Sequence, residues 1–255
     1  MYQFKMKILN GVNVMKSINK KYLSEQFDRK IIHVRKLEAQ KHHQEDMYAK
    51  PLQNKRKDKV VDIMMKYCNS KTFYDIGCAE GLFCNLAMSF GAISAKGVDV
   101  VDVKVEKAQT QFPGCFFQVK NCLNLNEKNQ YGLVLCSEVL QHIVDYRKCL
   151  NEIDKILEEN GILILTTPNL SQGKDHTFAN LDSRSSPNEL LNEIGGASFG
   201  KQNAIWKFNT RLLCKEIENE YSFKLVEYIK IGAKPINNQT KEQASNLFSV
   251  MAFSK

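Results

Sequence analysis

The chain has 255 residues, of which 43% are hydrophobic and 25% are charged. This balance is typical of a folded domain and excludes a largely disordered chain. No apolar run approaches the ~20 residues that span a bilayer, and the N-terminus has no apolar stretch followed by small residues, so we expect neither a membrane span nor a secretory signal. The eight Cys residues form no Cys-x-x-Cys pair and mostly lie in apolar runs. They indicate reduced, buried thiols in a cytoplasmic protein.

The net charge of +8 is concentrated in the first part of the chain. Residues 1–71 hold 17 Lys and Arg against 7 Asp and Glu, and the densest basic run is Lys55, Arg56, Lys57 and Lys59. One interpretation is a partner that carries negative charge, such as a phosphorylated metabolite, a nucleotide or RNA. The other is a solvated helix face. Aromatic side chains do not interleave with the lysines as a base-stacking surface requires. We expect residues 1–57 to form a basic helical arm or cap.

Hydrophobic spacing predicts a helix at 58–67, after Pro51, and then a regular alternation of strands and helices from residue 72. The predicted strands are 72–76, 95–99, 115–119, 133–136 and 162–166, and the helices between them are 82–90, 101–111 and 146–159. This alternation is typical of right-handed βαβ units, so we expect a parallel sheet with helices on both faces, an α/β three-layer sandwich.

The alternation stops at residues 169–209, which are rich in Ser, Asn and Gly. A connection this long inside a compact domain is usually functional, and we interpret it as a lid-like insertion. A helix at 210–218 and two strands at 223–228 and 247–253 are predicted to complete the sheet.

The segment 75–81, Asp-Ile-Gly-Cys-Ala-Glu-Gly, lies directly after a predicted strand and before a predicted helix. Glycine lets the backbone approach a ligand there, but the spacing differs from the Gly-x-Gly-x-x-Gly of dinucleotide folds. Glu80 is a poor neighbour for a diphosphate, so a ligand with a cationic or zwitterionic centre fits better. Asp99, at the end of the second strand, can accept hydrogen bonds from both hydroxyls of a ribose. Together they indicate a site for a nucleoside with a charged tail.

Four segments in this order, 75–81, 97–99, 136–142 and 161–169, resemble a class I S-adenosylmethionine-dependent methyltransferase. The resemblance is greatest to the group that contains the ubiquinone-biosynthesis O-methyltransferases. It implies a Rossmann-like methyltransferase domain at residues 58–255, with a mostly parallel seven-stranded sheet and an antiparallel last strand. It also implies S-adenosylmethionine as the cofactor, and it says almost nothing about the methyl acceptor.

The resemblance also assigns roles to individual positions. The expected cofactor-binding residues are Asp75, Gly77, Cys78 and Gly81 at the methionine end, Asp99 at the ribose, Asn121 and Cys122 beside the adenine, and Ser137 in the cleft shared with the acceptor. Three of the positions compared depart from the family pattern: Ala79 replaces the usual middle glycine, Asn121 stands where Asp is commoner, and Gly132 stands where Asp is frequent.

Glu138 and His142 are the candidates for catalysis, and Gln141 is considered with them because of its spacing. Their i, i+3, i+4 spacing predicts one face of a helix. Related enzymes have Glu-x-x-Glu-His here and bind a divalent cation, so Glu138 and His142, with His176 from the insertion, could hold Mg²⁺ or Mn²⁺, although Gln141 removes one negative charge. Without a metal, His142 is the best candidate general base. The plainer interpretation is that His142 bonds a backbone carbonyl and Glu138 caps a helix.

We expect an enzyme that methylates an oxygen of a small polar or anionic metabolite. The resemblance allows a quinone precursor, whereas a sugar or phosphate-bearing acceptor fits the basic arm better. Two alternatives stay open: an RNA ribose 2′-O-methyltransferase, whose basic arm would bind RNA, and a non-catalytic S-adenosylmethionine-binding protein. Trp206 and Phe208 could wall the acceptor pocket or pack in the core. The oligomeric state does not follow from the sequence.

Overall fold

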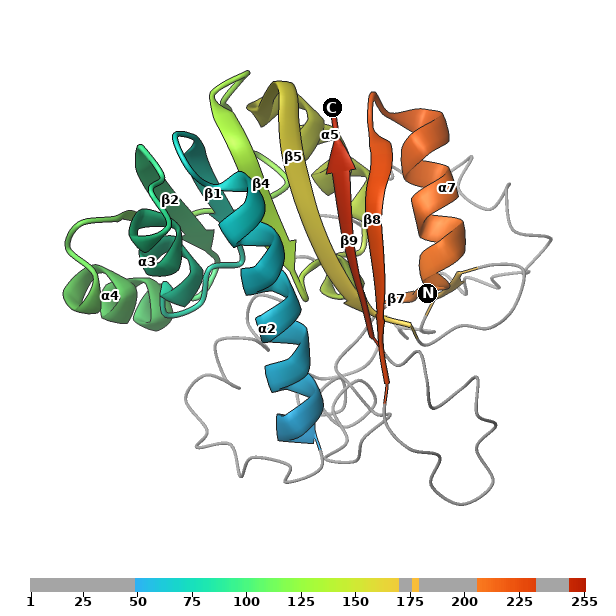
Figure 1. Cartoon of the computed structure of the whole chain (residues 1–255), viewed down its shortest axis with the longest axis horizontal. Coiled ribbons are helices and arrows are strands. Elements are labelled where there is room, and N and C mark those ends of the chain that lie inside the picture. Colours follow the sequence, from blue (N-terminus) through green and yellow to red (C-terminus); the bar gives the residue numbers. More distant parts are fainter. Residues whose placement is uncertain (1–48, 170–175, 179–205, 233–247) are drawn as a thin grey trace, which may run out of the picture.

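A seven-stranded sheet forms the centre of the molecule (Figure 1). The computed structural model describes residues 49–169, 176–178, 206–232 and 248–255. The strand order is β3-β2-β1-β4-β5-β9-β8. The strands are β1 (Thr72–Ile76), β2 (Ser94–Asp99), β3 (Phe116–Val119), β4 (Tyr131–Ser137), β5 (Leu157–Pro168), β8 (Lys224–Ile231) and β9 (Phe248–Ser254). Strands β1 to β5 are parallel, and β9 is antiparallel to both β5 and β8, which confirms the predicted fold class.

Helices cover both faces of the sheet (Figure 1). The helices are α2 (Ala49–Tyr67), α3 (Leu82–Ser89) and α4 (Asp102–Gln111) on one face, and α5 (Tyr146–Ile156) and α7 (Thr210–Glu220) on the other. Strand β4 shows why the sheet is buried on both sides. Leu133 and Leu135 pack into the core beneath α2, whereas Val134 and Cys136 pack into the core beneath α5. A run that is apolar at every position therefore suits a strand between two helix layers.

The strand order places a ligand crevice next to β1 and β4. The chain moves outward from β1 to β2 and β3, and then returns to the other side of β1 with β4. Open α/β sheets bind ligands at such a switch point, outside the carboxyl ends of the strands. Ile76 at the end of β1 lies beside Cys136 of β4 and Val98 of β2. The segments that follow these three strands therefore meet at one edge.

Two predicted helix boundaries are wrong. The helix predicted to end at Glu159 ends at Ile156, because the fully buried Leu157 pairs with Tyr131 as the first residue of β5. Helix α2 begins at Ala49 rather than at Asp58. Pro51 does not interrupt it, since a proline in the first turn replaces an N–H that has no partner within the helix.

Helix α2 runs without a break across residue 57, where the sequence predicts the basic arm to end. Residues 1–48 and most of the predicted lid lie outside the described residues, and the division into an arm and a domain stays a prediction. All eight cysteines are described as free thiols and seven of them are buried, as expected. Within the described ranges, no helix is both long enough and apolar enough to cross a bilayer.

Candidate active site

A cavity of about 310 Å³ opens at the carboxyl edge of β1, β2 and β4. Its volume lies at the lower end of the range of small-molecule sites. Seven of the residues expected from the sequence line it: Gly77, Asp99, Asn121, Cys122, Ser137, Glu138 and His142. Most of the remaining wall is apolar, and two lysines, Lys104 and Lys120, were not anticipated. Apart from these two lysines, the polar residues of the wall follow the ends of the strands and could be predicted from the sequence.

The other three expected residues, Asp75, Cys78 and Gly81, do not line the cavity. Gly81 and Cys78 instead pack closely against residues of the sheet. Gly81 lies against the Phe117 ring, since a Cβ on Gly81 would be 2.6 Å from that ring. The buried Cys78 side chain lies against Gly97 in the same way, with a Cβ on Gly97 falling 2.8 Å from the Cys78 Cβ. These small residues let the loop pack directly onto the sheet.

The loop between β1 and α3 is held in a left-handed conformation at several points. Gly77 and Gly81 have φ values of 75° and 85°, and Ala79 has a φ of 48°. A Cβ on Gly77 would lie only 2.4 Å from Cγ2 of Val139. Glycine is therefore required at position 77 by both its backbone angle and its close neighbour. This geometry keeps the loop from filling the cavity.

Asp99 fastens the loop to the end of β2. Its Oδ2 accepts a hydrogen bond from the Ala79 N–H at 3.0 Å, and its Oδ1 accepts one from the Val101 N–H at 3.0 Å. A carboxylate has about four lone-pair positions, so two remain for hydroxyl donors from the cavity. The position suits the ribose contact that the sequence predicts.

Asp75 is buried, at 1% exposure, and within the described residues its Oδ2 has no hydrogen-bond partner. Burial, and then the neighbouring charge of Asp99, raise the pKa of Asp75 to about 8. Native proteins rarely leave such an atom unpaired except at functional sites. The orphaned oxygen lies at the start of the loop predicted to hold a zwitterionic ligand.

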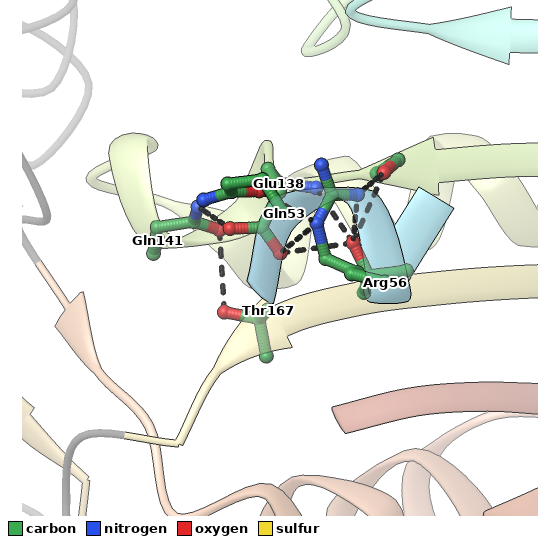
Figure 2. Close-up of polar contacts among 7 residues, drawn as sticks. Gln53, Arg56, Glu138, Gln141 and Thr167 are labelled. Carbon is green, nitrogen blue, oxygen red and sulfur yellow. Dashed lines mark hydrogen bonds and ion pairs between the residues drawn. The ribbon is translucent and has the colours of Figure 1, made fainter. Parts of the chain in front are cut away.

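Glu138 belongs to a buried polar network that the sequence did not reveal (Figure 2). Its Oε1 accepts a hydrogen bond from Oγ1 of Thr166 at 2.9 Å and lies 3.8 Å from Nε of Arg56. Arg56 is only 6% exposed, although it sits in the densest basic run. A signal was present in the sequence: Arg56 is four residues from both Leu52 and Val60, which are buried on α2. Because the helix was predicted to begin at Asp58, this stripe was overlooked.

The predicted helix face for Glu138, Gln141 and His142 is wrong. Only Leu140–His142 forms a helical turn, of the 3₁₀ type, and Glu138 has a left-handed φ of 59°. The Glu138 N–H donates to the Thr166 carbonyl at 3.0 Å, so the chain follows β5 for one more residue before it turns. The buried Gln141 points back towards β5, where its Oε1 accepts a hydrogen bond from Thr167.

The described residues do not fit a divalent cation. His176 lies away from Glu138: its Nε2 is 3.3 Å from Oε2 of Glu216, and its Nδ1 accepts the Asn209 N–H. Glu138 faces the guanidinium of Arg56, which places a positive charge where a cation would bind. Among the described residues no three His, Cys, Asp or Glu side chains cluster as metal ligands do. We therefore derive no step through a metal.

Trp206 and Phe208 pack into the core rather than lining the cavity. The Phe208 ring is fully buried 5.0 Å from the Tyr146 ring, and Nε1 of Trp206 donates to the Val144 carbonyl. Of the two interpretations that the sequence left open, the structure shows core packing.

A sequence model of a methyltransferase domain matches residues 42–210, which include the loop, Asp99 and the network around Glu138. The chain belongs to the methyltransferase-domain family. An uncharacterised protein of Methanocaldococcus jannaschii is 28% identical over 200 residues, which cover 66% of this chain and 83% of the relative. The ubiquinone biosynthesis O-methyltransferase of Pelagibacter ubique is 29% identical over 111 residues, which cover 41% of this chain and only 45% of that enzyme.

Solved methyltransferase structures share the fold of this methyltransferase. The N-methyltransferase NodS from Bradyrhizobium japonicum, in complex with S-adenosyl-L-homocysteine, superposes with a TM-score of 0.58 at 13% identity and covers 91% of this chain and 97% of its own. The family match, together with solved methyltransferases of this fold that bind S-adenosyl-L-homocysteine, supports S-adenosylmethionine as the cofactor. The cavity fits it chemically, with a glycine loop beside Asp99 and the orphaned Asp75 oxygen behind that loop.

Proposed function

We propose that this methyltransferase transfers its methyl group to an oxygen of a small polar or anionic metabolite of the sugar, phosphate or quinone-precursor type. One observation carries the proposal. Ser137, Glu138 and His142 line the same cavity as Gly77 and Asp99. Proton-accepting groups therefore face the space beside the expected cofactor site, where an acceptor hydroxyl has to lie.

The bound cofactor would supply an electrophilic methyl group on a positively charged sulfur. Held by the loop of Gly77 and by Asp99, the cofactor would offer its methyl carbon to the acceptor oxygen, and its sulfur would keep the electron pair of the broken carbon–sulfur bond. The hydroxyl proton passes to a group of the protein. Glu138 suits this role because burial raises the pKa of its carboxyl, an effect that Arg56 and the hydrogen bond from Thr166 oppose. A carboxylate with a raised pKa is the better proton acceptor. His142 lines the same end of the cavity as the second candidate base.

A preference for anionic acceptors is supported by the basic excess in residues 1–71. Arg56 does not contribute to it directly, because its charge faces Glu138. Of the two lysines in the cavity wall, Lys120 lies 3.0 Å from Glu127 and is partly neutralised, which leaves Lys104 as the clearer cation. An anionic acceptor would then meet Lys104 as the main cation of the described cavity wall.

An acceptor screen with methyl-labelled S-adenosylmethionine tests this function. The screen contains hydroxylated aromatic acids, sugar phosphates, amines and RNA, each with added Mg²⁺ or with a chelator. We expect label on a small hydroxylated acid, equal activity with the chelator, and a loss of about 10²–10⁴-fold in Glu138→Gln. Glu106→Gln, an exposed change on α4, is the matched control. Label only on amines or RNA, or no S-adenosylhomocysteine from any acceptor, contradicts the proposal.

A further inference from the structure

Arg56 is oriented differently from its neighbours in the basic run. Lys55 and Lys57 are exposed, whereas Arg56 points beneath α2 to the carboxyl ends of β4 and β5 (Figure 2). Its Nη1 donates to Oγ of Ser137 at 2.6 Å, and its Nε donates to Oε1 of Gln53, one helical turn earlier, at 3.0 Å. The guanidinium is thus held by one hydrogen bond within α2 and by another to the last residue of β4.

The hydrogen bonds run in one direction from Arg56 to Glu138. Arginine can only donate, so Ser137 Oγ accepts from Arg56 and directs its own proton to Oγ1 of Thr166, 3.0 Å away. Thr166 Oγ1 then donates to Oε1 of Glu138 at 2.9 Å. Each bond in such a chain polarises the next. Oε1 is consequently held as an acceptor. Among the described residues Oε2 meets only the 3.4 Å contact from Gln141, so it is the oxygen left to receive a proton.

Stability alone does not account for a buried charge at this position. Removing a guanidinium and a carboxylate from water costs several kcal/mol per ion, and apolar residues of similar volume often stabilise as well or better. The neighbours of Arg56 on the same stripe, Leu52 and Val60, show that α2 docks through apolar contacts. The Glu138 side chain retains 18% exposure. Since Glu138 also lines the cavity, the pair joins the underside of α2 to the reacting space.

We propose that Arg56 is a positioning residue for methyl transfer, which holds the Glu138 carboxylate at the cavity with Oε2 free to accept the proton of the acceptor. The inference rests on the proposed function of Glu138. It makes α2, which is outside the cavity wall, part of the catalytic apparatus. The attractive charge of Arg56 also lowers the pKa of Glu138 against the effect of burial.

The test compares Arg56→Met, Arg56→Lys and the exposed neighbour Lys57→Met in the full chain. Carbon-13 NMR of protein labelled at the glutamate carboxyls reports the titration of Glu138, with Glu138→Gln identifying its signal. We expect the Glu138 midpoint to rise by about one pH unit or more in Arg56→Met, which is at least a tenfold change in proton affinity. The midpoint is expected near the wild-type value in Arg56→Lys and unchanged in Lys57→Met.

Kinetics with the acceptor found in the screen supply the second readout. The acidic limb of the pH profile of kcat/KM is expected to follow the NMR midpoint in Arg56→Met. In Arg56→Lys, one ammonium cannot reach both Gln53 and Ser137, so kcat is expected to fall about tenfold while KM for S-adenosylmethionine changes little. Should Arg56→Met fail to fold, Arg56→Lys decides, and a wild-type kcat in that variant overturns the positioning role.

Failure of this inference is distinguishable from failure of the proposed function. If the wild-type chain releases no S-adenosylhomocysteine with any acceptor, the proposed function fails. If the wild type is active while Arg56→Met folds and moves neither the Glu138 midpoint nor the acidic limb, only the role of Arg56 is overturned.

Discussion

Asp75 lies in the middle of the sheet, between Gly97 of β2 and Leu135 of β4, and its Oδ2 has no hydrogen-bond partner among the residues that the structure describes. Its pKa rises from 3.8 to about 8, first through burial and then through Asp99. A raised pKa means that the folded protein holds this proton more tightly than the unfolded chain does. Its contribution to stability is therefore complete below pH 4 and is lost as the pH rises to about 8.

Asp75→Asn removes this titration. We expect the melting temperature of Asp75→Asn minus that of the wild type to increase steadily between pH 4 and pH 8 and then to level off. Scanning calorimetry of both proteins without cofactor measures it. The amide that Asp75→Asn introduces has its own hydrogen-bonding cost at every pH. The sign of the melting-temperature difference at a single pH therefore does not test the assignment. A difference that stays constant across this range contradicts the assignment.

Gly77 is the residue of the loop that tolerates a side chain least. Its φ of 75° and the 2.4 Å approach to Val139 predict that Gly77→Ala loses about 1–3 kcal/mol in the free energy of unfolding. Gly114 offers a matched control, because a Cβ there meets nothing within 4 Å. Urea unfolding of both variants makes the comparison. Equal stability of Gly77→Ala and Gly114→Ala would show that the loop adopts another conformation.

Residues that follow a strand could be predicted from the sequence, whereas Arg56 could not. Gly77, Asp99 and Ser137 each come directly after an apolar run or end it, so local pattern alone brings them to one edge of the sheet. The burial of Arg56 depends instead on which face of α2 meets the sheet. That face could not be assigned because Pro51 led to a predicted helix start at Asp58, after Arg56.

At the scale of elements, the turn after β4 shows a second limit of sequence patterns. A spacing of i, i+3, i+4 is compatible with a helix, but Glu138 continues the pairing with β5 before a single 3₁₀ turn. A turn this short has no periodicity to detect, and its shape follows from hydrogen bonds to Thr166 and Thr167, which are distant in sequence. Glu138 and His142 both line the cavity, but they do not share one face of a helix as the spacing predicts.

Glu127 links the loop between β3 and β4 to β2, to β4 and to Lys120 directly after β3. Its carboxylate accepts hydrogen bonds from Lys96, Lys120 and Tyr131. Burial alone would raise the pKa of Glu127, but the hydrogen bonds from Lys96, Tyr131 and Lys120 lower it to about 2. A depressed pKa contributes stability that is complete above pH 4.5 and is lost as the pH falls towards 2.

Glu127→Gln should therefore destabilise the protein by about 1.5–3 kcal/mol at pH 7, because the lysines lose a charged acceptor. The deficit should shrink as the pH falls below 4.5, where the wild-type carboxylate begins to take up its proton. Urea unfolding at pH 7 and pH 3.5 measures both values. A deficit that is equal at the two pH values would contradict the ionised state assigned to Glu127. It would also mean that the charge of Glu127 does not hold Lys120 in the cavity wall.

At the scale of the whole molecule, the fold followed from the sequence because its signals are repeated. Strands and helices alternate, except between β3 and β4, from residue 49 to residue 168, and the two core clusters use both faces of the same strands. The acceptor could not be predicted in the same way. Its contacts depend on a few side chains that line the cavity, where no comparable repetition exists.

The central claim is that the cavity beside the glycine loop binds an adenosyl compound through Asp99. Calorimetric titration with S-adenosylhomocysteine tests it most directly, on the wild type, on Asp99→Ala and on the exposed control Glu106→Ala. Loss of two hydrogen bonds worth about 1.5–3 kcal/mol each predicts at least a tenfold weaker affinity in Asp99→Ala. The account predicts one binding site per chain, weakened in Asp99→Ala and unchanged in Glu106→Ala. No binding by the wild type, or equal affinity in all three proteins, would contradict it.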